Sequence, residues 1–289
     1  MKYAFFLGCA APVLTGNYEL STRAVAKRLG IGLVDVDEFA CCGFPIESID
    51  HKTTILMAAR NLSIAKDLGL DILTICPGCA STLLEANREL KESRELREEV
   101  NKKLGKIGRS YEGGVKVKHF IKVLNEDIGT DKVKSSVKRN LEVLRIAPHY
   151  GCHYLKPSHL FNQYEDPEFP HSLDELISAA GARPVDYQDK MDCCGGIAFG
   201  IDDNISYTMT GKKLENIKKA GADAICLVCP LCNVMYDRNQ RAIERKLDTS
   251  YGLPVLFYPQ LLGLAMGFDE EELGLNLNRV KVSELLSKI

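Results

Sequence analysis

The cysteines of this 289-residue chain fall into two sets that repeat the same spacing. Each set begins with a single cysteine, continues with an adjacent pair, and ends with two cysteines separated by two residues. Corresponding cysteines lie 143 residues apart at the first position and 152 or 153 residues apart at the other four. A near-constant offset indicates an internal duplication, so the sequence predicts two similar units. The two sets are Cys9, Cys41, Cys42, Cys76 and Cys79, and then Cys152, Cys193, Cys194, Cys229 and Cys232.

The residues beside the cysteines repeat as well. "CCGFP" at 41–45 matches "CCGGI" at 193–197, and "CPGC" at 76–79 matches "CPLC" at 229–232. The eleventh cysteine, Cys226, has no counterpart in the first set. We interpret it as a small hydrophobic residue of a buried strand, since free cysteine commonly plays that part.

Apolar and amphipathic segments alternate in the same order in both units. The pattern predicts strands at 2–8, 32–37, 70–75, 144–150, 183–187 and 223–228. It predicts helices at 17–30, 51–69, 80–105, 172–181, 205–221 and 233–247. Strands that alternate with helices indicate an α/β fold, here with one small parallel sheet and flanking helices in each unit. We place the domains at 1–140 and 141–289, with the charged stretch 105–140 as their connection.

In this interpretation the cysteines follow strands and precede helices. Ligands gather at the carboxyl ends of strands in such sheets, and helix N-termini favour thiolates there. Two cysteines separated by two residues can reach one metal centre. The adjacent pairs need a turn to bring their side chains together, and the glycines at 43, 195 and 196 permit it. The ten repeated cysteines are therefore candidate metal ligands.

Other interpretations of the thiols remain open at this stage. Adjacent cysteines could form a strained disulfide, or could be small residues that pack a tight loop. Structural zinc and a cubane iron–sulfur cluster each take four ligands, whereas each unit offers five. Five thiolates favour a larger or more open iron–sulfur assembly. Two functions without catalysis are alternatives for such a site. One is a zinc-stabilised scaffold, and the other is an electron-transfer protein.

Charge and composition argue against nucleic-acid binding, a membrane span and a signal peptide. The formal net charge is −2 and no basic run stands out, which argues against nucleic-acid binding. The longest apolar runs fall short of the ~20 residues that a membrane span needs. The N-terminal stretch is too brief for a signal peptide and contains Cys9, so we expect a cytoplasmic protein.

The cysteine pattern resembles the CCG domain, and two copies in one chain resemble the B subunits of heterodisulfide reductases. "KYAFFLGC", "HYGCHYLKPS" and "PVLFYPQLLGLAMGF" carry the likeness to that family. The resemblance implies two noncubane 4Fe–4S clusters, each held by five of the ten cysteines. It implies reduction of the disulfide of coenzyme M and coenzyme B in anaerobic methanogenesis, with one electron from each cluster.

The same resemblance implies partners. They are a ferredoxin-like C subunit, a flavin-containing A subunit, and a hydrogenase or formate dehydrogenase upstream. The loops "GFPIESIDH" and "GGIAFGIDDN", which follow the two cysteine pairs, differ from those usual in methanogens. Another small or protein-bound disulfide in sulfur metabolism is therefore an alternative substrate.

Two cationic residues near Cys152 are candidates for substrate binding. His153 and Lys156 could meet an anionic thiol substrate, and His153 could deliver a proton to a departing thiolate. The alternative is an ordinary structural role for this cluster, with Lys156 in solvent and the nearby His149 hydrogen-bonded at a strand end.

Overall fold

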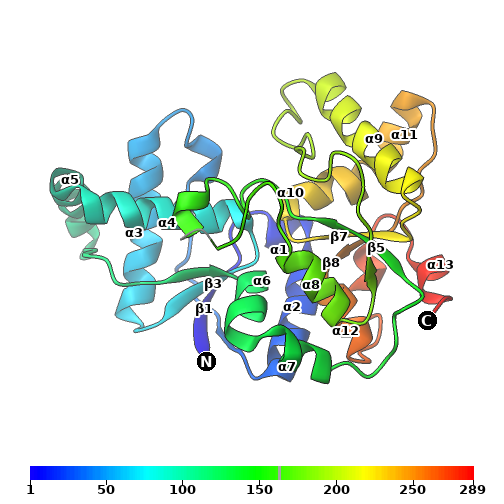
Figure 1. Ribbon diagram of the computed structural model, residues 1–289. Helices are drawn as coiled ribbons and strands as arrows, with labels where there is room; N and C mark the ends of the chain where they lie inside the picture. Colours follow the sequence, from blue (N-terminus) through cyan, green and yellow to red (C-terminus); the bar gives the residue numbers. More distant parts are fainter. Residues whose placement is uncertain (162–163) are drawn as a thin grey trace.

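Two four-stranded parallel sheets form the framework of the molecule, as the computed structural model of residues 1–161 and 164–289 describes it (Figure 1). The strand orders are β2-β1-β3-β4 and β6-β5-β7-β8, so the second sheet repeats the first. This topology confirms the α/β fold and the duplication. The strands are β1 (Lys2–Phe6), β2 (Gly32–Val34), β3 (Asp71–Thr74), β4 (Val117–His119), β5 (Arg145–His149), β6 (Arg183–Pro184), β7 (Ala224–Leu227) and β8 (Val255–Phe257).

Helices connect the strands and cover both sheets. Those of the first half are α1 (Ala11–Leu14), α2 (Gly16–Leu29), η1 (Phe44–Ile46), α3 (His51–Asp67), α4 (Pro77–Glu92), α5 (Arg94–Leu104), η2 (Gly105–Ile107), α6 (Phe120–Lys122), η3 (Val123–Ile128) and α7 (Thr130–Ser135). Those of the second half are η4 (Ser158–Phe161), α8 (Ser172–Ala179), α9 (Asp203–Lys219), α10 (Pro230–Asn233), η5 (Val234–Arg238), α11 (Gln240–Leu247), α12 (Tyr258–Ala265), η6 (Leu275–Leu277) and α13 (Ser283–Leu286).

The helix that follows each cysteine pair begins with the same cap. Asp50 accepts a hydrogen bond from the backbone of Thr53 at the start of α3. Asp202 accepts from Asn204 and Ile205 at the start of α9. A carboxylate at this position satisfies helix N–H groups that have no partner within the helix. The repeated cap therefore fixes where each cysteine loop ends.

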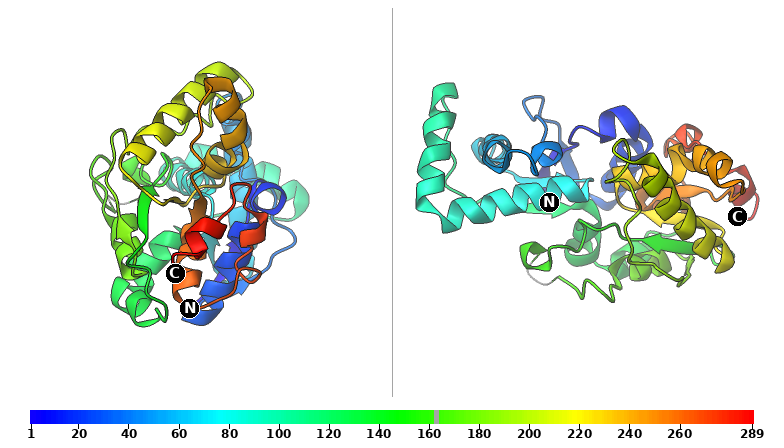
Figure 2. Two further views of the ribbon diagram at one scale, coloured as in Figure 1. Left: turned by 90° about the vertical axis from the view of Figure 1, so that its right-hand side faces the viewer. Right: turned by 90° about the horizontal axis from the view of Figure 1, so that it is seen from above.

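The single helix expected over 80–105 is interrupted at Ser93. Its backbone is extended, with φ −109° and ψ 107°, and its hydroxyl oxygen accepts a hydrogen bond from the Leu96 backbone. A serine N-cap starts a new helix more favourably than it continues an old one. As a result α5 turns away from α4, as Figure 2 shows in the view from above.

The stretch 105–140 is more than the expected connection between the halves. The pattern of 117–129 predicts a short helix, but residues 117–119 form β4, and helix begins only at Phe120. Strand β4 pairs in parallel with β3 from Ile72↔Val117 to Thr74↔His119. Val117 and His119 are buried there. The charged residues around this short strand obscure its apolar pattern, because only pairing with β3 gives it a buried face. The strand expected at 183–187 is shorter in the structure and comprises only Arg183–Pro184.

A helix from the C-terminal part of each half packs against the other half. Helix α12, which follows β8, packs against α2 of the first half, and α7, which follows β4, packs against α8 of the second (Figure 1). The Tyr18 ring of α2 stacks on Phe257 of β8 at 3.9 Å between ring centroids. One large hydrophobic core consequently contains residues from both halves. The domain limits at 140 and 141 remain a prediction.

None of the helices in 1–161 and 164–289 combines the length and the apolar character needed to cross a bilayer.

Candidate metal centre

The repeated cysteines lie where the strands of each sheet end. Cys76 follows β3 and Cys229 follows β7, and each occupies the N-cap position of the next helix. Pro77 and Pro230 take the first helical position, where a proline costs no hydrogen bond. The last cysteine of each set then lies in the first turn of its helix. Sequence analysis predicted this placement at strand ends correctly.

The adjacent cysteines converge because a glycine follows each pair. Gly43 has φ +102° and Gly195 has φ +85°, a conformation that residues with side chains rarely adopt. A Cβ atom on Gly43 would lie 3.0 Å from Thr54 Cα, and a Cβ atom on Gly195 would lie 2.7 Å from the backbone carbonyl oxygen of Ser206. The hydroxyl groups of Thr54 and Ser206 donate to the carbonyl oxygens of these glycines, at 3.3 and 3.0 Å. The turn is therefore fixed against the following helix.

A second glycine brings the first cysteine of each set close to the last. Gly8 precedes Cys9 with φ +69°, and a Cβ atom there would lie 2.7 Å from Cys79 Sγ. Gly151 precedes Cys152 with φ +74°, and its Cβ would lie 3.5 Å from Cys232 Sγ. The absence of a side chain at these positions leaves the sulfur atoms room to share one centre.

Both cysteine sets open onto one cavity of about 430 Å³. Nine of the ten repeated cysteines line it, and Cys41 lies behind them with its Sγ 4.0 Å from Cys9 Sγ. Apolar side chains from the two halves complete the wall, among them Leu7, Phe44, Ile197 and Leu231. The two sets therefore face each other across a chamber that is poor in polar groups. The lining cysteines are Cys9, Cys42, Cys76, Cys79, Cys152, Cys193, Cys194, Cys229 and Cys232.

The thiols of each set share protons through hydrogen bonds. Bonds from the thiols of Cys41 and Cys79 lower the pKa of Cys42 to about 3. Bonds from Cys152 and Cys194 lower the pKa of Cys193 to about 2. The pKa values of the donors Cys41 and Cys152 are raised, because each proton is held against a neighbouring sulfur and burial disfavours a second charge. Several thiolates can coexist here only when a cation replaces these protons.

The donor set fits iron–sulfur chemistry. All eleven cysteines lie within the described residues and are free thiols, so none is consumed by a disulfide. Each repeated set offers five cysteine sulfur atoms, one more than tetrahedral zinc accepts. Soft thiolate ligands select zinc, copper(I) and iron–sulfur clusters among biological metals. The residues present therefore suit a polynuclear iron–sulfur cofactor in each half.

His153 reaches from the second half to the first. Its Nδ1 lies 3.4 Å from the Ser81 hydroxyl oxygen on α4, and its ring meets Phe44 edge-on at 4.8 Å between centroids. It also lines the cavity. Lys156, by contrast, is not brought to the cavity, because its ammonium group forms an exposed salt bridge with Glu168 at 2.7 Å. Of the two expected substrate residues, only His153 lies beside the cysteines.

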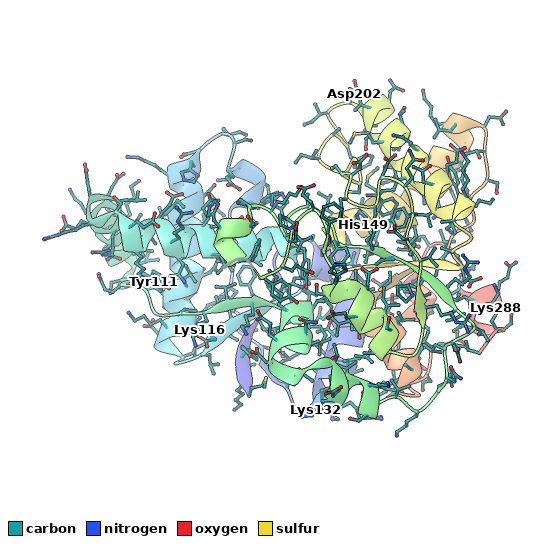
Figure 3. The ribbon with its side chains drawn as sticks, in the orientation of Figure 1. Tyr111, Lys116, Lys132, His149, Asp202 and Lys288 are labelled. Carbon is teal, nitrogen blue, oxygen red and sulfur yellow. The ribbon has the colours of Figure 1, made fainter. Side chains whose placement is uncertain are left out.

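Two buried polar residues of the second half lie behind the cysteines. Sequence analysis placed His149 near Cys152 without assigning it to the metal site, and it did not single out Lys213. His149 Nε2 lies 3.3 Å from Cys232 Sγ, and Lys213 anchors the segment before Cys193 (Figure 3 labels His149). Alignment of the two repeats contains the signal, since Phe6 and Asn61 occupy the equivalent positions of the first half. Cys226 lies on β7, fully buried in the hydrophobic core and away from the cavity, as expected.

The fold and the site together define a duplicated cysteine-rich α/β protein. The sequence model of the CCG cysteine-rich domain matches residues 3–84 and 146–237, and the chain belongs to this family.

Full-length relatives refine the comparison. The chain is 41% identical to the B subunit of the ferredoxin/F420H2-dependent CoB–CoM heterodisulfide reductase of Methanosarcina acetivorans, over 100% of this chain and 97% of the relative. It is 35% identical to a protein of Archaeoglobus profundus described as similar to the heterodisulfide reductase B subunit, over 94% and 93%. It is 32% identical to the membrane anchor subunit of the 8-methylmenaquinol:fumarate reductase of Wolinella succinogenes, over 98% and 99%.

A solved structure supports the fold. The chain superposes on a hypothetical protein of Helicobacter pylori with a TM-score of 0.81 and 17% identity, covering 97% of this chain and 52% of that chain.

Proposed function

We propose that this protein is an iron–sulfur subunit that reduces a disulfide, and that its substrate is the heterodisulfide of coenzyme M and coenzyme B. The relative from Methanosarcina acetivorans is named as a subunit of a CoB–CoM heterodisulfide reductase, and the relative from Archaeoglobus profundus as a protein like the heterodisulfide reductase B subunit. The single observation that carries the proposal is the common cavity lined by cysteines of both halves. A disulfide needs two electrons, and two one-electron centres on opposite walls of one chamber can supply them.

The ten repeated cysteines would hold the cofactors, one noncubane 4Fe–4S cluster in each half. The first would lie on Cys9, Cys41, Cys42, Cys76 and Cys79, and the second on Cys152, Cys193, Cys194, Cys229 and Cys232. When bound, the two clusters supply one electron each to the substrate disulfide. The five free thiols of each repeated set and the room left by Gly8 and Gly151 support this assignment.

The protein's own side chains prepare the chamber for this chemistry. Leu7, Phe44, Ile197 and Leu231 give it an apolar wall, which favours entry of a sulfur–sulfur bond and keeps water away. Among the described residues, His153 is the one imidazole on the lining, and its Nδ1 lies 3.4 Å from the Ser81 hydroxyl oxygen. We assign it the delivery of a proton to a departing thiolate. Lys156 has no part in this assignment.

The comparison with Wolinella succinogenes supports a second candidate. That relative belongs to an 8-methylmenaquinol:fumarate reductase and aligns over 98% of this chain. In this alternative the same two centres pass electrons between a quinol and a partner without reducing a disulfide. A different small or protein-bound disulfide is a third possibility for the substrate.

Partners and location follow as proposals. The relatives from Methanosarcina are named as B subunits of multisubunit enzymes. We propose that this chain works with a ferredoxin-like C subunit, which passes electrons to it, and with a flavin-containing A subunit. A hydrogenase or formate dehydrogenase would supply the electrons, and the complex would work in the cytoplasm.

Anaerobic reconstitution tests the proposal. Because two clusters hold four irons each, we expect roughly eight irons and eight sulfides per chain. The loaded protein should reduce the heterodisulfide with a reduced viologen as the electron donor. C42A and C194A should each abolish turnover, whereas C226A, which changes a core cysteine, should preserve it.

Three outcomes would contradict the proposal. Tightly bound zinc without iron would favour a scaffold. Full iron loading with quinol oxidation but no disulfide reduction would favour the second candidate. Loss of turnover in only one of the two cysteine variants would contradict the use of two centres.

A further inference from the structure

The two cysteine sites are equivalent in their sulfur atoms but differ in the residues behind them. His149 precedes Cys152 by three residues, and at the same place before Cys9 the first half has Phe6. Lys213 follows Asn61 by 152 residues, the offset that also relates the two cysteine pairs. All four side chains are buried. The duplication therefore keeps the ligands and changes their polar surroundings in one half alone.

In the tautomer with its proton on Nε2, His149 gives the second site a hydrogen-bond donor to a thiolate sulfur. It ends β5, and its Nε2 lies 3.3 Å from Cys232 Sγ. The ligand atoms of His149, Cys194 and Cys232 all lie within 4.8 Å of one another. Tyr236 meets the imidazole ring edge-on at 4.9 Å between centroids, which fixes its orientation. In the first half, Phe6 packs on Phe39 at 5.0 Å and offers no donor.

Lys213 gives the second site a cationic side chain. It lies on α9 with 2% of its surface exposed. Its ammonium group donates to the carbonyl oxygen of Lys190 at 3.0 Å and to that of Asp192, beside Cys193. Burial lowers the pKa of this ammonium group, and the neighbouring sulfur atoms of Cys232 and Cys194 and the carboxylate of Asp192 oppose that shift. In its charged form, Lys213 places an ammonium group behind the second cysteine set.

Asn61 anchors the corresponding segment of the first half, but its side chain is uncharged. Its amide nitrogen donates to the carbonyl oxygens of Ala40 and Cys41, each at 3.2 Å, and its amide oxygen accepts from the Ala40 backbone at 2.9 Å. Both sites have carboxyl groups nearby. Burial and the neighbouring Glu85 raise the pKa of Glu47 on the first side, and Asp192 directly precedes Cys193 on the second. The first site therefore differs from the second in lacking the ammonium group of Lys213.

We propose that the second site, built on Cys152, Cys193, Cys194, Cys229 and Cys232, has the higher reduction potential and receives the first electron. The proposal rests on the iron–sulfur assignment of the proposed function. Hydrogen bonds to sulfur and the net charge nearby set the potential of an iron–sulfur centre, and both act in the same direction here. Positive charge and N–H donors stabilise the reduced state, which carries one more negative charge.

The electron count is simple. One electron passes from an external one-electron donor, such as a reduced viologen, to the second site, so the donor loses what the site gains. A second donor molecule then reduces the first site. The two sites together hold the two electrons that cleavage of a disulfide requires.

Potentiometric titration followed by electron paramagnetic resonance of the reconstituted full chain tests the order. In K213N, which copies the first half, we expect one signal to become at least tenfold harder to reduce, a shift of about 59 mV for one electron. H149F should shift the same signal in the same direction. N61K should make the other signal easier to reduce. K212N is the matched control, since exposed Lys212 pairs with Asp189 and should leave both signals in place.

The outcomes separate this inference from the proposed function. Two loaded sites whose potentials are equal, or do not respond to K213N, H149F and N61K, would overturn the inference and leave the cluster assignment intact. Failure of the wild-type chain to bind iron at all would overturn the proposed function itself. The opposing shifts of K213N and N61K keep the test valid even where one variant folds poorly.

Discussion

The Tyr18 hydroxyl group of α2 donates a 3.2 Å hydrogen bond to the carbonyl oxygen of Val228, the residue before Cys229. Tyr18 belongs to the first half and Cys229 to the second. The same tyrosine ring stacks on Phe257 of β8. The packing of α2 against the second half therefore contributes to the position of a candidate ligand in the second site.

The Tyr18 hydrogen bond can be tested by unfolding. Y18F keeps the ring but leaves the Val228 carbonyl oxygen buried without its donor, which should cost about 1–3 kcal/mol. Denaturant unfolding of the metal-free, reduced protein measures this loss. Y207F is the control, because the Tyr207 hydroxyl group forms no hydrogen bond within the described residues. Equal effects of both substitutions would show that the contact with Val228 contributes nothing specific.

A substitution in the turn after one cysteine pair should damage only the site to which that pair belongs. G195A would place a Cβ atom 2.7 Å from the backbone carbonyl oxygen of Ser206. The turn should open and the second site should lose its iron, so we expect about half the wild-type stoichiometry after reconstitution. G69A is matched to it, since Gly69 also has a positive φ, +65°, but has free space around its Cβ position. Equal iron contents in the two variants would show that the turn does not shape the site.

Cys226 should be dispensable for metal binding. It is fully buried on β7 within the hydrophobic core, and burial raises the pKa of its thiol. C226A should therefore keep the full iron content and lose about 1 kcal/mol of stability through the missing sulfur atom. Iron and sulfide analysis of C226A beside C229A checks this. A shared loss of iron would make Cys226 a ligand and contradict its assignment to the core.

His153 and Lys156 should behave differently although they lie only three residues apart in the chain. H153F keeps an aromatic ring against Phe44 but removes the proton donor, and turnover should fall about 100-fold or more. K156A breaks only an exposed ion pair with Glu168 and should change turnover by no more than about twofold. Heterodisulfide reduction by reduced viologen is the assay. Iron content serves as the control, because a drop in H153F would indicate damage to the site.

The sequence by itself determined the duplication, the α/β class and the placement of ten cysteines after strands. These features depend on residues close together in the chain. Apolar periodicity defines the strands and helices, and a glycine after each cysteine pair permits the turn. The cap at Ser93, which divides α4 from α5, is also a local feature, but helical periodicity on both sides of it predicted one continuous helix.

Only the tertiary structure decided how the two halves combine. Strand β4 exists because β3 offers it a parallel partner, and α12 covers α2 because the apolar faces of distant segments need burial. The same long-range packing brings both cysteine sets to one cavity, carries His153 to Ser81 and leaves Lys156 in solvent. It also gives His149 and Lys213 their place behind the sulfur atoms. Contacts of this kind join residues far apart in the chain, so local sequence patterns do not contain them.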